Sequence, residues 1–407
     1  MATGVSRSTG TGTGRWEDAA VHVLIVPSAF SGSLTAGQAA AAMAQGWSRA
    51  APHDVLAQVP ISDGGPGFVD VVAATAGGRL HACVTTDPLG RPVPATILLV
   101  EGDGRRTAYV ESAHAVGLHL LAPAERDPSH TTSFGMGPLL SAAVDLGATR
   151  IVVGLGGSGT NDAGAGLLTA LGVGHRSRLG CGGLALLDTR EDDLGGLETA
   201  RQRFTGIDLV AATDTEAPLL GLKGTSAMSA VAKGASEQQA QRLENAIGHF
   251  ASVVSRVQPP AKNLLSGALL RPEREPGAGA SGGLGYALRL LGARPTGGVR
   301  AVLDAARFDT LLAAADLVVT GEASFDWESL HGPVMQVAAA AGQVGVPAVV
   351  IAGQALVGRR EAMAGGISGV YAVAERRSQV DAMLADPAGT LTARAARVAR
   401  TWSPHRP

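Results

Sequence analysis

Short apolar runs rich in valine, isoleucine and leucine recur along the chain, and alanine-rich segments of helical periodicity lie between several of them. The runs begin at residues 21, 95, 107, 150, 208, 316 and 347, with VHVLIV, RIVVGLGGS and DLVVTGEA as examples. Uninterrupted apolar strands that alternate with helices are typical of parallel sheets covered on both faces. The pattern therefore predicts an α/β fold.

Two stretches interrupt this alternation. Residues 81–100, HACVTTDPLGRPVPATILLV, read as two strand-like pieces joined by a D-P-L-G turn, which predicts a hairpin with antiparallel pairing. Proline and glycine are dense from residue 259 to residue 283, and strands like the first one resume after this break. We therefore expect both chain ends to build one α/β domain, from residues 21–78 and 290–400, with residues 79–289 inserted as a mixed α/β domain.

Composition narrows the classes of function. The chain has 407 residues, 45% of them hydrophobic and 17% charged, so it can bury a large core. Its net charge of -2 gives no attraction to nucleic acid or to a membrane surface, and no apolar run reaches the roughly 18 residues of a membrane span. Cys83 and Cys181 have no metal-binding or redox spacing.

The amino terminus is rich in Gly, Ser and Thr and lacks the apolar core of a signal peptide. This composition predicts that residues 1–20 form a disordered leader. We expect a cytoplasmic protein that acts on a small molecule, without a nucleic-acid or membrane partner, as a monomer or a homodimer.

Acidic residues follow several predicted strands in glycine-rich turns. Asp63 lies in PISDGGPGF, Asp214 in ATDTEAPLLG, and Glu322 and Asp326 in TGEASFDWESLHG. Open α/β sheets place ligand contacts just beyond the carboxyl ends of their strands. Each carboxylate taken alone is more simply a helix cap or a turn former. Their recurrence at strand ends favours a common cleft.

The segment GLGGSGTNDAGAG, residues 154–166, follows the strand RIVV and predicts an anion cradle. Glycines let backbone N–H groups approach an anion, and a following helix would add its positive end. No Gly-Lys-Ser/Thr follows, so this is not a Walker A loop. A turn that serves packing alone, with Asp162 as a helix cap, is the open alternative.

Two further side-chain types could carry chemistry. His114 lies close to Glu111 in sequence, and His130 lies in DPSHTTSFG, so either could act as a general base. Lys233, in AVAKGAS, is the most suggestive lone cation of the central region. A hydrogen-bonded structural histidine and a solvated surface lysine are the corresponding structural interpretations.

In chain order, many segments resemble motifs of the bacterial glycerate kinase family, the type that phosphorylates glycerate on its 2-hydroxyl. They are SGSLTA, SDGGPG, TDPLGRPV, ERDPSHTTSFGMG, VVGLGGSGTNDAGAG, ATDTEAPLLG, AKGAS, PGAGASGGLG, ADLVVTGEASFD and GVPAVVIAG. The resemblance covers nearly the whole chain, from about residue 21 to the 370s. It implies two α/β domains, one of them Rossmann-like and formed by both chain ends, an active site in the cleft between them, and ATP with Mg²⁺.

The candidate site residues fall into three groups. Those assigned to catalysis are Asp63, Asp214, Lys233 and His114. Those assigned to the cradle of the ATP phosphates are Gly156, Gly157, Ser158, Thr160, Asn161, Asp162, Ser31 and Ser33. Those assigned to Mg²⁺ are Asp162, Glu322 and Asp326.

The chain departs from the family pattern at several charged positions. The family's first turn reads Pro-Asp-Ser-Phe-Lys-Gly-Ser, and here Ser28 and Ser31 replace its acid and its lysine. Ser324 and Pro333 replace a family arginine and a family lysine. Phosphoryl transfer depends on cations that neutralise the transferring oxygens, and Lys233, Arg91 and Arg126 are the cations left to supply this charge.

These losses leave two alternatives open. The first is a member of the family that uses no cofactor and applies acid/base chemistry, with Glu111, His114, His130 and Asp63, to a larger and more apolar biosynthetic substrate. The second is a binding protein that keeps only the scaffold.

Overall fold

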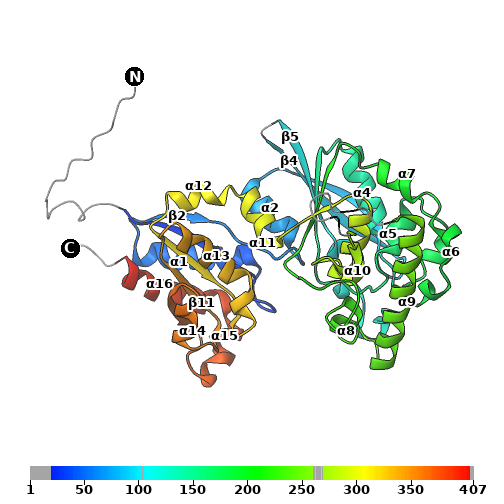
Figure 1. The fold of residues 1–407 in the computed structure, drawn as a ribbon. Coiled ribbons are helices and arrows are strands. Elements are labelled where there is room, and N and C mark those ends of the chain that lie inside the picture. Colours follow the sequence, from blue (N-terminus) through cyan, green and yellow to red (C-terminus); the bar gives the residue numbers. More distant parts are fainter. Residues whose placement is uncertain (1–19, 103, 260–261, 263–266, 268, 404–407) are drawn as a thin grey trace.

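The computed structural model describes residues 20–102, 104–259, 262, 267 and 269–403. These residues form two large sheets and one two-stranded sheet, with helices around them (Figure 1). The α/β fold predicted from the alternation of strands and helices is therefore confirmed. Residues 1–19 of the expected leader lie outside the described part of the chain.

A five-stranded parallel sheet is built from both ends of the chain. Its order is β13-β11-β9-β1-β2, and its strands are β1 (His22–Pro27), β2 (Val55–Gln58), β9 (Leu317–Gly321), β11 (Ala348–Ala352) and β13 (Ile367–Ala372). From β1 the chain runs first to β2 on one side and later to β9 on the other. The strand order therefore reverses between β1 and β9, which is where doubly wound sheets bind ligands.

Helix α1 (Ala36–Ala50) follows β1 and packs against α16 (Pro387–Trp402). Thr35 caps α1, because its hydroxyl accepts a hydrogen bond from Gln38 N–H while the Gln38 side chain accepts one from Thr35 N–H. Small alanines and the buried Met43 and Trp47 form the inner face of α1. The cap thus fixes the point where the turn after β1 ends.

The second sheet has six strands in the order β3-β4-β5-β6-β7-β8. These are β3 (Arg79–Thr86), β4 (Pro92–Gly102), β5 (Arg105–Glu111), β6 (Arg150–Gly154), β7 (Asp208–Ala212) and β8 (Arg294–Thr296). Strands β3, β4 and β5 pair antiparallel, which confirms the predicted hairpin, whereas β5 to β8 pair in parallel. Because β8 belongs to this sheet, the sheet extends beyond residue 289, where the inserted domain was expected to end.

Helices α2 (Phe68–Ala76) and α11 (Gly298–Ala305) lie between the two sheets (Figure 1). One hydrophobic cluster contains Val26 of β1, Phe68 of α2, Val299 of α11 and Tyr109 of β5. The Phe68 and Tyr109 ring centroids are 6.1 Å apart. This shared core holds the carboxyl ends of β1, β6 and β7 in a fixed relation.

The remaining elements surround these layers. The helices are α3 (Ala113–Val116), α4 (Met136–Asp145), α5 (Ala165–Ala170), α6 (Arg176–Leu179), α7 (Leu197–Gln202), α8 (Thr225–Ser229), α9 (Glu237–Val257), α10 (Ala280–Leu290), α12 (Phe308–Ala313), α13 (Pro333–Gln343), α14 (Arg359–Ala364) and α15 (Val380–Ala385). A two-stranded parallel pair joins β10 (Ser324–Phe325) to β12 (Gln354–Ala355). Within the described residues, no helix has both the length and the apolarity that a membrane crossing requires.

Candidate functional site

A crevice of about 880 Å³ opens at the reversal point of the five-stranded sheet. The turn after β1, residues 28–35, forms one wall, and the segment Glu322–Ser324 after β9 forms another. Asp63 and Pro66, from the loop before α2, complete it. Ser31 and Ser33 therefore line this crevice, and Ser33 Oγ donates a hydrogen bond to Phe30 O over 2.9 Å.

The charged side chains that line this crevice are all acidic. They are Asp63, Asp70 and Glu322, and no lysine, arginine or histidine is among the residues of its wall. Burial raises the pKa of Glu322 to about 7, and Asp326 adds to the shift. Glu322 Oε1 is buried and has no hydrogen-bond partner in the described structure. The crevice can therefore exchange a proton near neutral pH.

Asp63 and Asp214 lie where the two sheets meet. Asp63 Oδ1 accepts a hydrogen bond from Gly65 N–H over 2.9 Å, and Asp214 Oδ2 accepts one from Val299 N–H over 3.0 Å, at the start of α11. Gly298 packs so closely on Asp63 that a Cβ there would lie 1.8 Å from Asp63 O. Burial raises the pKa of Asp214, and the Asp63 carboxylate raises it further. The structure thus brings these two predicted residues together.

Asp214 also lines a second cavity, of about 720 Å³, between the two sheets. Thr213 and Gly277 come from the side of the six-stranded sheet, whereas His331 and Gln336 come from the segment around the start of α13. A carboxyl group with a raised pKa in such a cavity is a candidate general base. Sequence reasoning missed His331 and Gln336, because they lie far from Asp214 along the chain.

The glycine loop after β6 meets the Asp63 loop directly. A Cβ on Gly156 would lie 2.6 Å from Gly65 Cα, and one on Gly157 would lie 2.7 Å from Pro66 Cγ. Only residues without side chains allow the two loops to approach this closely. Gly156, which is half-buried, and Gly157, which is exposed, therefore place glycine backbone beside Asp63 at the junction of the sheets.

The rest of the predicted cradle is turned inward. Ser158, Thr160, Asn161 and Asp162 are buried. Asp162 accepts hydrogen bonds from Ser133 N–H and Oγ–H and from Gly164 and Gly166 N–H, and burial raises its pKa. Asp162 thus anchors the loop. Helix α5 has six residues, and Asp162 already occupies nearby N–H groups, so the expected anion-binding helix end is not formed.

Asn161 holds α8 in place. Its amide donates to Ser226 Oγ over 3.0 Å, and its carbonyl oxygen accepts from Thr225 Oγ1 over 3.1 Å. The side chains of Thr225 and Ser226 are buried, so the Asn161 side chain faces the protein interior. The backbone of the loop, rather than this amide, is what reaches the junction of the sheets.

The three carboxylates expected to bind Mg²⁺ are not gathered into one set. Asp162 is enclosed in the six-stranded domain, Glu322 lines the crevice, and Asp326 Oδ1 accepts hydrogen bonds from Glu328 and Ser329 N–H in the turn after β10. Within the described residues, no group of three or more His, Cys, Asp or Glu side chains is arranged to hold a metal ion. The carboxylates of Asp63 and Asp214 interact at the junction of the sheets, and those of Glu322 and Asp326 interact beside the crevice.

Glu111 joins the two sheets through α2. Its carboxylate accepts hydrogen bonds from Gly67 N–H over 3.0 Å and from Val69 N–H over 3.2 Å, although Glu111 ends β5. His114 Nε2 lies 3.8 Å from Glu111 Oε1, and His114 Nδ1 is buried without a partner in the described structure. His130, by contrast, is exposed beside Asp127.

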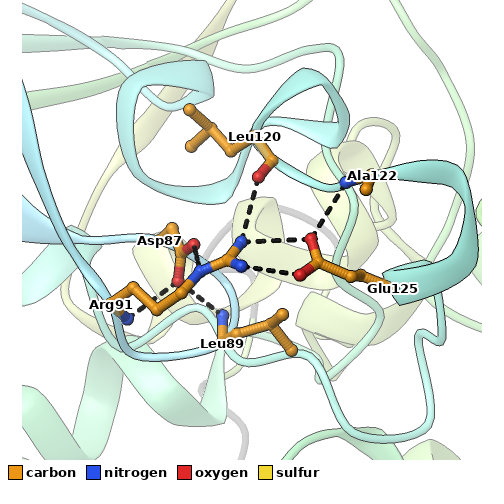
Figure 2. Close-up of polar contacts among 6 residues, drawn as sticks. All are labelled: Asp87, Leu89, Arg91, Leu120, Ala122 and Glu125. Atoms are coloured by element: carbon orange, nitrogen blue, oxygen red, sulfur yellow. Dashed lines mark hydrogen bonds and ion pairs between the residues drawn. The ribbon is translucent and has the colours of Figure 1, made fainter.

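Arg91 is fully engaged by other groups and cannot serve as a free cation (Figure 2). Its guanidinium donates to Asp87 over 2.6 Å, to Glu125 over 2.7 Å and to the Leu120 carbonyl over 3.2 Å. The two carboxylates raise the pKa of Arg91, and Arg91 lowers the pKa of Glu125. This network closes the D-P-L-G-R turn of the hairpin.

Lys233 is buried rather than solvated. Its Nζ donates a hydrogen bond to the Thr160 carbonyl over 2.8 Å, so it contacts the glycine loop from the interior. Burial lowers the pKa of Lys233 to about 8, and the Asp162 carboxylate opposes this shift. The sequence analysis assigned Lys233 to catalysis. In the structure Lys233 lies on the interior side of the glycine loop after β6.

Comparison with known proteins gives a consistent result. The family model described as "Glycerate kinase family" matches residues 23–403. A glycerate kinase of Bacillus subtilis is 38% identical over 82% of this chain and 85% of its own length, and a glycerate 2-kinase of Escherichia coli is 37% identical over the same shares. A crystal structure of a protein described as a candidate glycerate kinase 2, from Salmonella typhimurium LT2, superposes with a TM-score of 0.77 at 33% identity and covers 94% of this chain and 98% of that one.

Proposed function

Because the chain belongs to the glycerate kinase family, we propose that it transfers a phosphoryl group from ATP to a hydroxyl of glycerate or of a closely related hydroxy acid. The observation that carries this proposal is the pair formed by Asp63 and Asp214 where the two sheets meet. Both side chains lie beside exposed glycine backbone and beside a large cavity. Phosphoryl transfer needs this kind of positioning more than it needs covalent chemistry.

Asp214 is the group that would accept the proton of the reacting hydroxyl. Its raised pKa makes the carboxylate a stronger base than an exposed aspartate. The Asp214 carboxylate accepts hydrogen bonds from Val299 and Gly298 N–H and from the Gln336 side chain, and these donors hold it beside the cavity. Asp63 adds negative charge beside it, which strengthens the base further.

The residues present fit Mg²⁺ and ATP in part. Mg²⁺ is usually held by one or two carboxylates together with substrate phosphates and water, and Asp63 can supply such a carboxylate while Asp214 serves as the base. The exposed backbone at Gly157 fits phosphate oxygens. When bound, magnesium ATP would supply the phosphoryl group and neutralise its charge. Glu322 is a further carboxylate nearby, because it lines the same crevice as Asp63.

One observation favours a second candidate function. The crevice of about 880 Å³ presents acids and hydroxyls but no basic side chain, as expected from the serines at positions 28, 31 and 324. Such a crevice suits a larger, uncharged substrate better than a triphosphate. Acid/base chemistry without ATP, with Glu322 as the group that titrates near pH 7, is the activity this would support.

Purified protein incubated with ATP, Mg²⁺ and D-glycerate tests the proposal through phosphorus NMR of the product. We expect a new phosphomonoester signal that requires glycerate, and its loss in Asp214→Asn. Asp145→Asn is the matched control, because Asp145 is an exposed aspartate at the end of α4, outside both cavities. If no nucleotide binds at millimolar concentration, the second candidate replaces the kinase.

A further inference from the structure

The buried ammonium group of Lys233 lacks an anionic partner. Its hydrogen bond to the Thr160 carbonyl is the one described for this group, and none of the described carboxylates forms an ion pair with it. The carboxylate that interacts electrostatically with Lys233 is that of Asp162. It already accepts four hydrogen bonds, from Ser133, Gly164 and Gly166. A buried charge is costly unless it is paired, so this ammonium group has capacity for an external anion.

Other buried hydrogen-bond donors without partners lie on the chain segments around Lys233. Buried side-chain atoms without a hydrogen-bond partner in the described structure include Ser129 Oγ, Thr160 Oγ1, Ser281 Oγ and Arg126 Nε. Ser129 and Thr160 have exposures of 0%. Native proteins rarely leave buried donors unpaired, and such groups call for a water, an ion or a ligand.

Backbone contacts bring these donors into one region. Thr131 Oγ1 donates to Gly159 O over 2.8 Å, so the segment that carries Arg126 and Ser129 runs along the glycine loop. A Cβ on Gly282 would lie 2.0 Å from Thr160 O, which places Ser281 against the same residue. Gly234, next to Lys233, packs equally tightly on the Arg126 carbonyl.

The backbone at this place is strained. Ser281 has φ 50° and ψ 46°, a left-handed conformation that is unfavourable for residues other than glycine, and Gly282 and Gly283 continue it. Ala163, which also has a positive φ of 53°, donates its N–H to Gly282 O over 2.9 Å. Strained residues gather where a side chain must be held in one position for a ligand.

This region adjoins the cavity that contains Asp214. Gly277 lines that cavity, and Gly279 N–H donates to the Ala217 carbonyl over 2.9 Å. The chain then continues directly to Ser281. Arg126 and Ser281 are partly exposed, whereas Lys233 and Thr160 are buried.

We propose that Lys233, Arg126, Ser129, Thr160 and Ser281 form a binding site for a small oxyanion, a carboxylate or a phosphate group. The proposal rests on the proposed function, in which the acceptor carries a carboxylate and the donor carries phosphates. An ammonium, a guanidinium and hydroxyl groups are the donors that such oxyanions require. The site supplies the basic charge that the acidic crevice lacks.

Isothermal titration calorimetry with D-glycerate, glycerol, inorganic phosphate and ADP tests this site. We expect an oxyanion to bind and glycerol, which has no charge, not to bind. Lys233→Met should weaken the affinity about 10- to 100-fold, because charge-assisted hydrogen bonds are lost. Lys223→Met is the matched control, since Lys223 is exposed, and it should leave the affinity unchanged.

Ser281→Ala keeps the test valid if Lys233→Met fails to fold. Ser281 Oγ has no hydrogen-bond partner in the described structure, so its removal breaks no intramolecular bond. We expect Ser281→Ala to fold normally and to weaken oxyanion binding by roughly 3- to 10-fold. Unchanged affinity in both variants, or no oxyanion bound by the wild type, would overturn the proposal.

The outcomes also separate this site from the proposed function. If inorganic phosphate binds and both variants lose it, but glycerate is never phosphorylated, the oxyanion site stands and the kinase activity fails. If glycerate is phosphorylated with the same KM by wild type and by both variants, the activity stands and the oxyanion site fails. Binding of glycerate alone identifies the carboxylate of the acceptor, and binding of ADP and phosphate alone identifies the donor.

Discussion

The Asp63 carboxylate raises the pKa of Asp214 across the junction of the two sheets. Each aspartate follows a strand of a different sheet, and α11 contacts both, because Val299 N–H donates to Asp214 and Gly298 packs on Asp63 O. The proposed reaction therefore depends on how α2 and α11 hold the sheets together. The first two predictions test that arrangement.

Gly298→Ala should disrupt the junction. The new Cβ would lie 1.8 Å from Asp63 O, and neither backbone can move freely in a shared core. We expect the free energy of unfolding to fall by about 2 to 3 kcal/mol in urea titrations. Gly342→Ala, in α13, has open space around its Cβ and should be neutral or stabilising. Equal stability of the two variants would show that Gly298 is not confined in this way.

Glu111 should act as a positioning residue for α2. Glu111→Ala leaves the N–H groups of Gly67 and Val69 without their acceptor, which costs about 2 to 3 kcal/mol of stability. Glu111→Gln retains one oxygen and should recover part of that loss. Denaturant unfolding measures both. If Glu111→Gln were as unstable as Glu111→Ala, hydrogen bonding to α2 would not be the role of this side chain.

Glu322 should make stability depend on pH. Its folded pKa of about 7 exceeds the ordinary value of 4.5, so the folded protein binds the proton more tightly and loses stability as pH rises from 4.5 to 7. Glu322→Gln should reduce this pH-dependent loss of stability by about 1 to 2 kcal/mol. The effect is smaller than the full pKa shift of Glu322 implies, because water in the crevice solvates the carboxylate. Unfolding at pH 5 and pH 8 measures the effect, and Glu328→Gln, in the same segment but exposed, should not change it.

Arg91 should contribute to the hairpin and not to ligand binding. Arg91→Ala removes the partner of Asp87, which is 1% exposed, so we expect the free energy of unfolding to fall. The affinities for glycerate and ADP should stay unchanged in calorimetric titrations, because the Arg91 guanidinium already donates hydrogen bonds to Asp87 and Glu125 (Figure 2). If Arg91→Ala weakened the affinity for glycerate or ADP without lowering stability, Arg91 would belong to the ligand-binding site.

Local signals in the sequence predicted the α/β fold, the hairpin and the turns that carry Asp63 and Asp214. Apolar periodicity and the D-P-L-G turn are properties of neighbouring residues, so they can be read directly. The burial of Asp162 could not be predicted, because its donor Ser133 comes from a separate segment of the chain that only the fold brings beside the loop. A glycine-rich loop looks alike whether its polar side chains face a ligand or the core.

The charged groups show the same limit. Lys233 and Arg91 look equally available in the sequence, yet the structure pairs Arg91 with Glu125 and leaves Lys233 with the Thr160 carbonyl. Glu111 reaches the start of α2 because β5 ends beside it, which no spacing along the chain reveals. Partners that are distant in sequence decide which charges remain free for chemistry.

The pH dependence of kcat/KM for glycerate phosphorylation tests the central claim most directly. In the wild type, activity should fall on the acidic side as Asp214 becomes protonated, and Asp214→Asn should lower kcat/KM by at least about 100-fold. Asp63→Asn should shift that acidic limb to lower pH, because Asp63 raises the pKa of Asp214. An acidic limb that is identical in wild type and Asp63→Asn, or full activity in Asp214→Asn, would contradict the account.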